Sequence, residues 1–131
     1  FIIGLSNRTN QLGAENLSTI LQDLNATVEI CKTPDDILHF KSECSVIDDD
    51  TILVSNKMAQ LDYLRSNYQL IELPLGEEGA ANSLRINDKL LLPDGFEKAE
   101  EILSKKYTII KVKVDEIAKV DAGLSCMSLR Y

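Results

Sequence analysis

A pattern of strand, helix and strand that returns along the chain constrains its fold more than any other feature. The apolar run over residues 51–56 predicts a buried strand, residues 57–66 have apolar side chains at helical spacing, and residues 68–73 alternate as a second strand. The same order returns 38 residues later, with a strand, a helix and a strand over 89–92, 96–106 and 107–114. Self-similarity at about 40 residues is typical of stacked or radially arranged modules. The sequence therefore predicts an α/β fold built from repeated units.

The start of the chain resembles a third copy of this pattern. Residues 1–7 parallel residues 50–56, a helix follows, and a strand closes the copy over 27–31. The apolar face of that helix is predicted to consist of Leu12, Leu17, Ile20, Leu21 and Leu24.

A short segment after each copy is predicted to open a further strand, at 44–47, 82–85 and 127–130. The acidic run 48–50 and the pair 87–88 then form hairpin turns, which gives modules of the order ββαβ. A calcium loop at 48–50 is disfavoured because the glycine and the closing glutamate of an EF-hand are missing. Lys105 and Lys106 are expected to form a solvated helix end.

Composition bounds the class of protein. A chain of 131 residues with 44% hydrophobic residues suggests one domain, and no apolar run approaches the roughly 18 residues of a membrane span. A net charge of −7 without a basic run makes nucleic acid an unexpected partner. One histidine and no Cys-x-x-Cys motif argue against zinc, and three cysteines indicate thiols in a reducing cytoplasm.

Cys126 and His39 are the candidate catalytic pair. Cys126 stands in a polar loop with a glycine, shortly after Asp121, and His39 is the only histidine of the chain. A cysteine nucleophile and a distant histidine that handles protons are the minimal requirements of thiol-based catalysis. A buried structural thiol is the alternative, and it is the interpretation that we prefer for Cys31 and Cys44.

Three motifs carry a resemblance to a known family. They are Gly-Leu-Ser-Asn-Arg-Thr-Asn-Gln-Leu-Gly-Ala-Glu over 4–15, His-Phe-Lys-Ser over 39–42 and Asp-Ala-Gly-Leu-Ser-Cys-Met-Ser-Leu-Arg over 121–130. In this order they resemble the dimethylarginine dimethylaminohydrolases, members of the guanidine-modifying enzymes. The resemblance runs from Phe1 to Tyr131 and implies an α/β propeller (pentein) of ββαβ modules. The chain begins on an apolar run and ends within a predicted strand, so we expect it to be part of a longer protein. The resemblance implies that residues 1–131 are the C-terminal portion of one such catalytic domain, with the N-terminal portion absent.

The resemblance also implies a role for each candidate residue. Cys126 is the nucleophile, His39 the general acid and base, and Asp121 a hydrogen-bonding partner of the substrate guanidinium. Arg8 binds the α-carboxylate of the substrate and Ser125 orients the site. From position alone, Arg8 is equally a solvated surface side chain, His39 a loop histidine, and Asp121 and Ser125 turn residues.

The implied reaction is hydrolysis of Nω-methylated L-arginine to L-citrulline and a methylamine, without metal or cofactor. The partner is then a small guanidino molecule, and the family's other acids come from the N-terminal half, so association with that half or a homodimer is expected. Two alternatives stay open: a hydrolase of arginine itself and an inactive fragment. The deiminases usually have an acid two residues after the histidine, where this chain has Lys41, which favours the methylarginine hydrolases.

Overall fold

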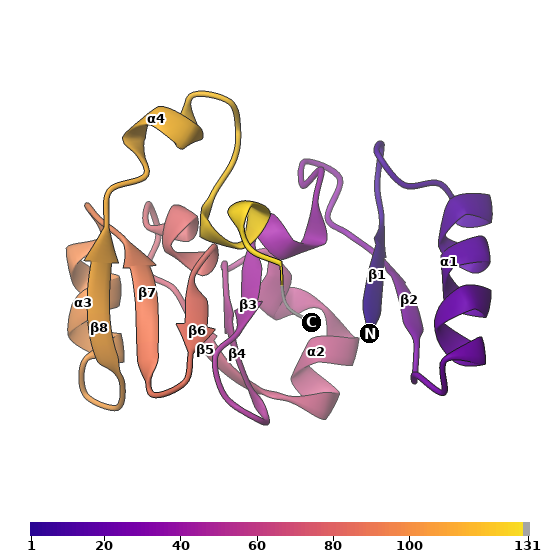
Figure 1. The fold of residues 1–131 in the computed structure, drawn as a ribbon, viewed down its shortest axis with the longest axis horizontal. Helices are drawn as coiled ribbons and strands as arrows, with labels where there is room; N and C mark the ends of the chain where they lie inside the picture. Colours follow the sequence, from indigo (N-terminus) through magenta and orange to yellow (C-terminus); the bar gives the residue numbers. More distant parts are fainter. Residues whose placement is uncertain (130–131) are drawn as a thin grey trace. The chain divides into compact units, whose positions relative to one another are not determined.

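The computed structural model describes residues 1–129, which fall into two compact units. The first comprises Phe1–Phe40 and the second begins at Lys41. Each unit is an α/β structure (Figure 1). No helix within residues 1–129 has both the length and the apolar character that crossing a bilayer requires.

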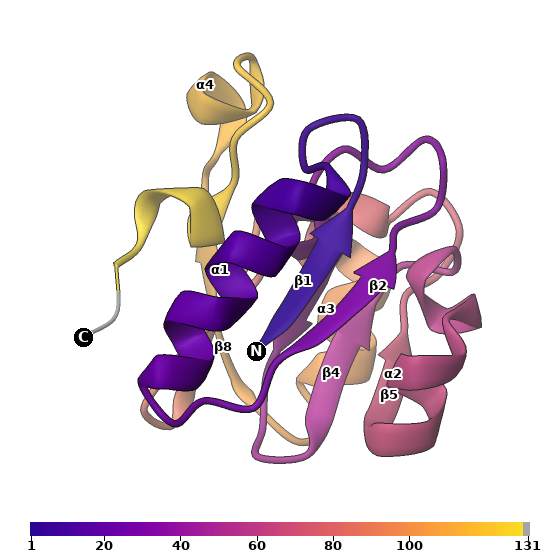
Figure 2. The same ribbon diagram turned by 90° about the vertical axis from the view of Figure 1, so that its right-hand side faces the viewer.

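The first unit is a strand–helix–strand unit. Strand β1 (Ile2–Leu5) leads into helix α1 (Gln11–Asp23), and strand β2 (Glu29–Lys32) returns parallel to β1 with Ile3 opposite Ile30. The helix begins at Asn10, whose side chain accepts a hydrogen bond of 2.8 Å from the backbone N–H of Gly13. A helical crossover is the usual way to join parallel strands, and α1 runs along the β1–β2 pair (Figure 2).

The predicted face of α1 was wrong. The helix buries Ala14 completely and Ser18 almost completely, whereas its large apolar side chains Leu12, Leu17, Ile20 and Leu24 are 45–72% exposed. Ala14 and Ser18 are four residues apart and therefore share one face. Their small side chains let the helix backbone lie close to the strands, which the leucine stripe could not do.

The second unit contains the two predicted ββαβ modules. In the first module, strands β3 (Cys44–Val46) and β4 (Thr51–Val54) form an antiparallel hairpin through the acidic turn. Helix α2 (Asp62–Asn67) then leads to strand β5 (Gln69–Glu72), which pairs parallel to β4. The predicted hairpin and strand order are confirmed here.

The second module repeats this order. Strands β6 (Leu84–Ile86) and β7 (Lys89–Pro93) form the hairpin, helix α3 (Glu97–Leu103) follows, and strand β8 (Thr108–Val112) pairs parallel to β7. The turn of the hairpin places Asn87 at φ 55°, a left-handed conformation that asparagine tolerates. Each sheet of the second unit thus mixes one antiparallel and one parallel pair.

Three predicted segments differ from the structure. The helix predicted over 57–66 is divided at Leu61, which is extended, into the 3₁₀ helix η2 (Met58–Gln60) and α2. The helix predicted to reach residue 106 ends at Leu103. No strand opens over the described part of 127–130, since a 3₁₀ helix, η4 (Leu124–Met127), occupies its beginning. Residues 130 and 131 lie outside the described part of the chain.

The two modules of the second unit share one hydrophobic core. Its largest fully buried members come from the strands of both sheets, the segments next to them and helix α3: Ile47, Leu53, Leu73, Leu90, Leu92 and Leu103. On α3, Ala99 and Leu103 face this core, whereas Ile102 is 38% exposed. Ala80 and Ala81, in the 3₁₀ helix η3 (Glu78–Ala81), are also fully buried.

A charged network joins the hairpin turn of the first module to the second module. The carboxylate of Asp48 accepts from Arg85 at 2.5 Å and pairs with Lys106 at 3.1 Å, and Tyr107 donates to it at 3.4 Å. Lys106 is therefore an ion-pair partner beyond the end of α3, which corrects its prediction as a solvated helix end. The Arg85 guanidinium, followed by Lys106, holds the pKa of Asp48 well below its usual range.

Candidate active site

Cys126 lies on a short turn near the end of the described chain. After β8 the chain forms helix α4 (Asp115–Ala118) and returns toward β6 as the turn η4 (Figure 1). The backbone N–H of Cys126 donates to the carbonyl of Gly123 at 3.1 Å, and the Cys126 side chain is exposed. The thiol therefore sits on a hydrogen-bonded turn and is open to a reactant.

Asn82 attaches this turn to the second unit. Its Oδ1 accepts a 2.9 Å hydrogen bond from the backbone N–H of Ser125, and its Nδ2 donates to Sγ of Cys126 at 3.8 Å. Gly123 makes the approach possible, because a Cβ there would overlap Nδ2 of Asn82 and lie 2.5 Å from its Cγ. No pattern in the sequence points to Asn82, which stands 44 residues before Cys126 and belongs to no motif near it.

Several groups act on the ionisation of Cys126. Burial raises the pKa of the thiol, but a backbone hydrogen bond at Gly123, the Asn82 amide, the charge of Lys41 and the Ser125 hydroxyl outweigh it, and the pKa lies below its ordinary value. The Lys41 ammonium donates to the carbonyl of Ser125 at 3.3 Å. The Ser125 Oγ atom is buried and makes no hydrogen bond of regular geometry, so its effect on the thiol is one of proximity. A lowered pKa and an exposed sulfur are the conditions that make a cysteine reactive.

The other two cysteines have different surroundings. Cys31 lies within β2, half-buried, where burial and then the charge of Glu29 raise the pKa of its thiol. Cys44 opens β3 opposite Val54 and is also half-buried. None of the three cysteines is in a disulfide within residues 1–129. Only Cys126 is both exposed and shifted toward the thiolate.

His39 and Arg8 lie in the first unit, on two loops joined by one hydroxyl group. The Ser6 side chain donates to the carbonyl of Leu38 at 2.7 Å and accepts from the backbone N–H of Arg8 at 3.1 Å. Both candidate side chains are exposed. Ser6 thus connects the run over 4–15 to Leu38, the residue before His39, which places Arg8 and His39 on neighbouring loops of the first unit.

Gly4 contributes to the same arrangement because it has no side chain and therefore allows close packing. A Cβ at this position would lie 2.7 Å from Cγ2 of Thr33 and 2.9 Å from Cβ of Phe40, so residues on both sides of His39 pack directly on the backbone of β1. Thr33 also donates to the carbonyl of Leu5 at 2.7 Å. A glycine at position 4 therefore allows the His39 loop to lie against the strand that leads to Arg8.

Asp121 occupies a turn between α4 and η4. Its φ of 56° is left-handed, its backbone N–H donates to the carbonyl of Ala118 at 3.1 Å, and it is exposed. The structure thus brings Ser125 and Cys126 together on one turn, with Asp121 in the segment that leads to it. Cys126 and His39 belong to different compact units, and that they act together stays a prediction.

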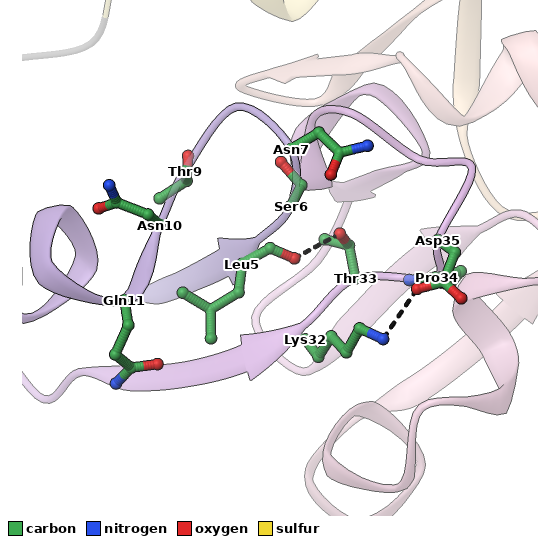
Figure 3. A pocket seen from close by; sticks show the side chains of 10 residues that line it. All are labelled: Leu5, Ser6, Asn7, Thr9, Asn10, Gln11, Lys32, Thr33, Pro34 and Asp35. Atoms are coloured by element: carbon green, nitrogen blue, oxygen red, sulfur yellow. Dashed lines mark hydrogen bonds and ion pairs between the residues drawn. The ribbon is translucent and has the colours of Figure 1, made fainter.

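A hollow of about 350 Å³ lies in the first unit where β1 and β2 end and α1 begins. Figure 3 shows its polar lining, which includes Ser6, Asn10 and Thr33, and the ion pair of 2.8 Å between Lys32 and Asp35 at its edge. Arg8 and His39 are not among the residues that line it. Within residues 1–129, no group of three His, Cys, Asp or Glu side chains is placed to hold a metal ion.

Comparison with known proteins gives similarity over the whole chain. The chain is 30% identical over 132 residues to an N(G),N(G)-dimethylarginine dimethylaminohydrolase of Pseudomonas aeruginosa, and covers 51% of that relative. It superimposes with a TM-score of 0.93 and 29% identity on the structure of a cysteine-to-serine mutant of the Pseudomonas aeruginosa enzyme complexed with citrulline, covering 100% of this chain and 51% of that one. No family model matches the chain.

More distant structures share the fold alone. The inosamine-phosphate amidinotransferase of Streptomyces griseus has 19% identity and a TM-score of 0.79, over 95% of this chain and 41% of its own. The fold is therefore that of the guanidine-modifying enzymes, α/β with mixed sheets. The resemblance to the dimethylarginine dimethylaminohydrolases is confirmed, and the chain spans about half the length of the relatives that it matches.

Proposed function

We propose that this chain is the nucleophile-bearing, C-terminal portion of a cysteine hydrolase that acts on the guanidinium group of Nω-methylated L-arginine. One observation carries the proposal: the exposed Cys126 thiol, on a turn fixed by Asn82, has its pKa lowered by its surroundings. Similarity to an enzyme that was crystallised with citrulline supports the choice of substrate class.

The reaction begins at the sulfur. The Cys126 thiolate attacks the guanidinium carbon, a C–S bond forms, and the C–N bond to the methylated nitrogen breaks as His39 gives that nitrogen a proton. The covalent intermediate is a thiouronium ion. Water then attacks the same carbon and gives one of its protons to His39. As the C–S bond breaks, the second water proton passes to solvent, and neutral citrulline leaves with the thiolate restored.

Two side chains of opposite charge recognise the two ends of the substrate. Asp121 accepts hydrogen bonds from the planar guanidinium, and the Arg8 fork binds the α-carboxylate of the amino acid. Ser125 orients the site next to the nucleophile. Further acids are contributed by the rest of a propeller of ββαβ modules, of which the modules seen here are part, and we place the enzyme in the cytoplasm.

Lys41 is the feature that favours methylated arginine over arginine. Deiminases of this family place an acid two residues after the histidine, where it would attract a cation. Here an ammonium group bonds to Ser125, beside the nucleophile, and adds positive charge to this side of the site. Methylated and unmodified guanidinium groups carry the same charge, so the support for the methylated substrate comes from the departure from the deiminase pattern at position 41.

A substrate panel tests the proposal. The full-length protein is incubated with asymmetric dimethylarginine, monomethylarginine, arginine and agmatine, and citrulline and the released amine are measured. We expect turnover of the methylated substrates, its loss in Cys126→Ser, and its retention in Cys31→Ser and Cys44→Ser. Turnover of arginine alone would contradict the proposed substrate, and an equal loss in Cys44→Ser would identify a different nucleophile.

A further inference from the structure

We propose that Asn82 is a second functional residue at the nucleophile: one end of its amide fixes the backbone of Ser125, and the other stabilises the thiolate of Cys126. This inference deepens the proposed function and rests on it for the part that concerns turnover. Its statement about the thiol can be tested without any substrate.

The amide has one orientation that satisfies both contacts. Oδ1 accepts from the backbone N–H of Ser125 at 2.9 Å, which leaves Nδ2 directed at Sγ of Cys126 at 3.8 Å. A flipped amide would oppose the Nδ2 donor to a backbone N–H, which cannot accept. The backbone contact therefore holds an N–H donor toward the sulfur.

A donor in this place distinguishes the two forms of the thiol. A thiolate accepts an N–H hydrogen bond more strongly than a neutral thiol does, so the contact favours ionisation. The same asparagine contributes to the lowered pKa of Cys126, after the effects of burial and of the Gly123 backbone. An uncharged donor suits a site for a cationic substrate, because it stabilises the thiolate without adding charge that would repel the guanidinium.

Asn82 is anchored as a positioning residue should be. It follows η3, its backbone N–H donates to the carbonyl of Gly79 at 3.3 Å, and only 8% of it is exposed. The preceding residues Ala80 and Ala81 are fully buried in the second unit, and the hydroxyl of buried Ser83 donates to the Ala80 carbonyl at 2.7 Å. The amide thus extends from the core to the turn, and its own motion is restricted by that core.

Gly123 shows that the turn accommodates Asn82 closely. A side chain at position 123 would overlap the amide, so the turn packs on Asn82 with no space left for a Cβ. A purely structural asparagine would need only the Ser125 contact. The additional closeness to the sulfur is what assigns Asn82 a chemical role.

The test measures the pH dependence of Cys126 alkylation. In a Cys31→Ser/Cys44→Ser background, the iodoacetamide rate is followed from about pH 5 to 10, and its midpoint reports the ionisation of the single remaining thiol. Asn82→Asp keeps the size and the acceptor for Ser125 but replaces the donor with a carboxylate. We expect its midpoint to rise by about one pH unit or more, and that of Asn82→Ala to rise less.

A matched control variant and a measurement of thermal unfolding show whether a shifted alkylation midpoint is specific to Asn82. Asn67→Asp makes the same change on the exposed end of α2, where the Asn67 amide donates to the Tyr63 carbonyl, and should leave the midpoint unchanged. Thermal unfolding of each variant shows whether it is folded. A folded Asn82→Asp variant with the midpoint of the parent protein would overturn the proposal.

Turnover by the full-length protein distinguishes this inference from the proposed function. If the midpoint shifts in Asn82→Asp while the parent protein hydrolyses no methylarginine, the thiol inference holds and the proposed function fails. If the parent protein hydrolyses methylarginine and Asn82→Asp changes neither the midpoint nor the pH profile of kcat, the inference fails and the proposed function holds.

Discussion

The Cys126 thiol is tuned by residues that are far apart in sequence. Lys41 reaches the carbonyl of Ser125 from the start of the second unit, Asn82 contacts the turn from its middle, and Gly123 contributes its backbone. Because these groups converge on a sulfur that is exposed, the turn can favour the thiolate before any substrate binds. A guanidinium cation bound nearby would then favour the Cys126 thiolate further.

Replacement of Lys41 by methionine should raise the pKa of Cys126. The variant loses a positive charge that favours the thiolate and the hydrogen bond to Ser125. Since the Lys41 side chain is exposed, we expect a rise of about 0.1–0.7 pH unit in the alkylation midpoint, smaller than for Asn82→Asp. Lys113→Met, an exposed lysine after β8, is the control. A midpoint that falls in Lys41→Met would contradict the assigned direction.

The sequence suggests candidate residues for the chemistry of the site but does not reveal the contacts that support them. Cys126 and His39 were recognisable because a reactive thiol and a lone histidine are rare residue types in informative positions. Asn82 and Ser6 were not assigned roles, because each acts through contacts with loops 32 or more residues away. Such contacts depend on tertiary packing, which no local pattern in the sequence reports.

At the scale of elements, apolar runs and alternation correctly predicted the strands of both modules. The spacing of large apolar residues, by contrast, predicted the wrong buried face for α1. The hairpins of both modules followed from apolar runs separated by Asp and Asn turns, where the local signal is strong. For α1 the five large apolar residues of the predicted stripe outnumber the two residues that are buried, Ala14 and Ser18, so the stripe was chosen as the packing face. The structure instead buries Ala14 and Ser18, because their small side chains allow the helix to lie close to β1 and β2.

Enlarging Ala14 should therefore cost more stability than truncating Leu17. Ala14 is completely buried, and Ala14→Leu would force α1 away from its strands, at about 1–3 kcal/mol of unfolding free energy. Leu17 is 45% exposed, and Leu17→Ala should change the unfolding free energy by less than about 1 kcal/mol. Urea unfolding of both variants measures the two values. The reverse order would restore the leucine stripe as the packing face.

The Asp48 network makes a prediction about pH. The pKa of Asp48 is lowered in the folded chain, first by Arg85 and then by Lys106, so folding favours its charged form. Its contribution to stability is therefore fully present above its unfolded pKa of about 3.9 and is lost as pH falls through its folded pKa. Asp48→Asn should lower the Tm at neutral pH, and the difference from the parent chain should shrink as pH falls below about 4.

Thermal unfolding followed by circular dichroism at several pH values measures this difference. Asp49→Asn is the matched control, because Asp49 lies in the same turn and is exposed. A Tm difference that stays constant from about pH 7 to pH 2 would show that Asp48 acts through packing and not through its charge.

At the scale of the whole molecule, the chain contains the proposed nucleophile, Cys126, and spans about half the length of the relatives that it matches. Its two compact units contain three sheets of two or three strands, and small sheets have unpaired edges that invite association. The exposed leucines of α1 add apolar surface of the kind that association buries. We expect the 131-residue chain to form dimers or larger species, which light scattering at increasing concentration would detect. A monodisperse monomer at high concentration would contradict this.

The isolated 131-residue chain should retain the thiol reactivity of Cys126 but show little turnover. The groups that favour the Cys126 thiolate, Lys41, Asn82 and Gly123, all lie within the second unit, so alkylation should proceed with the lowered midpoint. Binding of a guanidinium needs more than one carboxylate, and Asp121 is the one carboxylate that the sequence assigns to this role. We therefore expect the 131-residue chain to react with iodoacetamide at Cys126 and to release little citrulline from any methylated arginine. Cys126→Ser, which should abolish both signals, sets the baseline of each assay. Robust turnover by the isolated chain would show that Asp121 and Arg8 suffice to hold the substrate, and that the site needs no contribution from outside these residues.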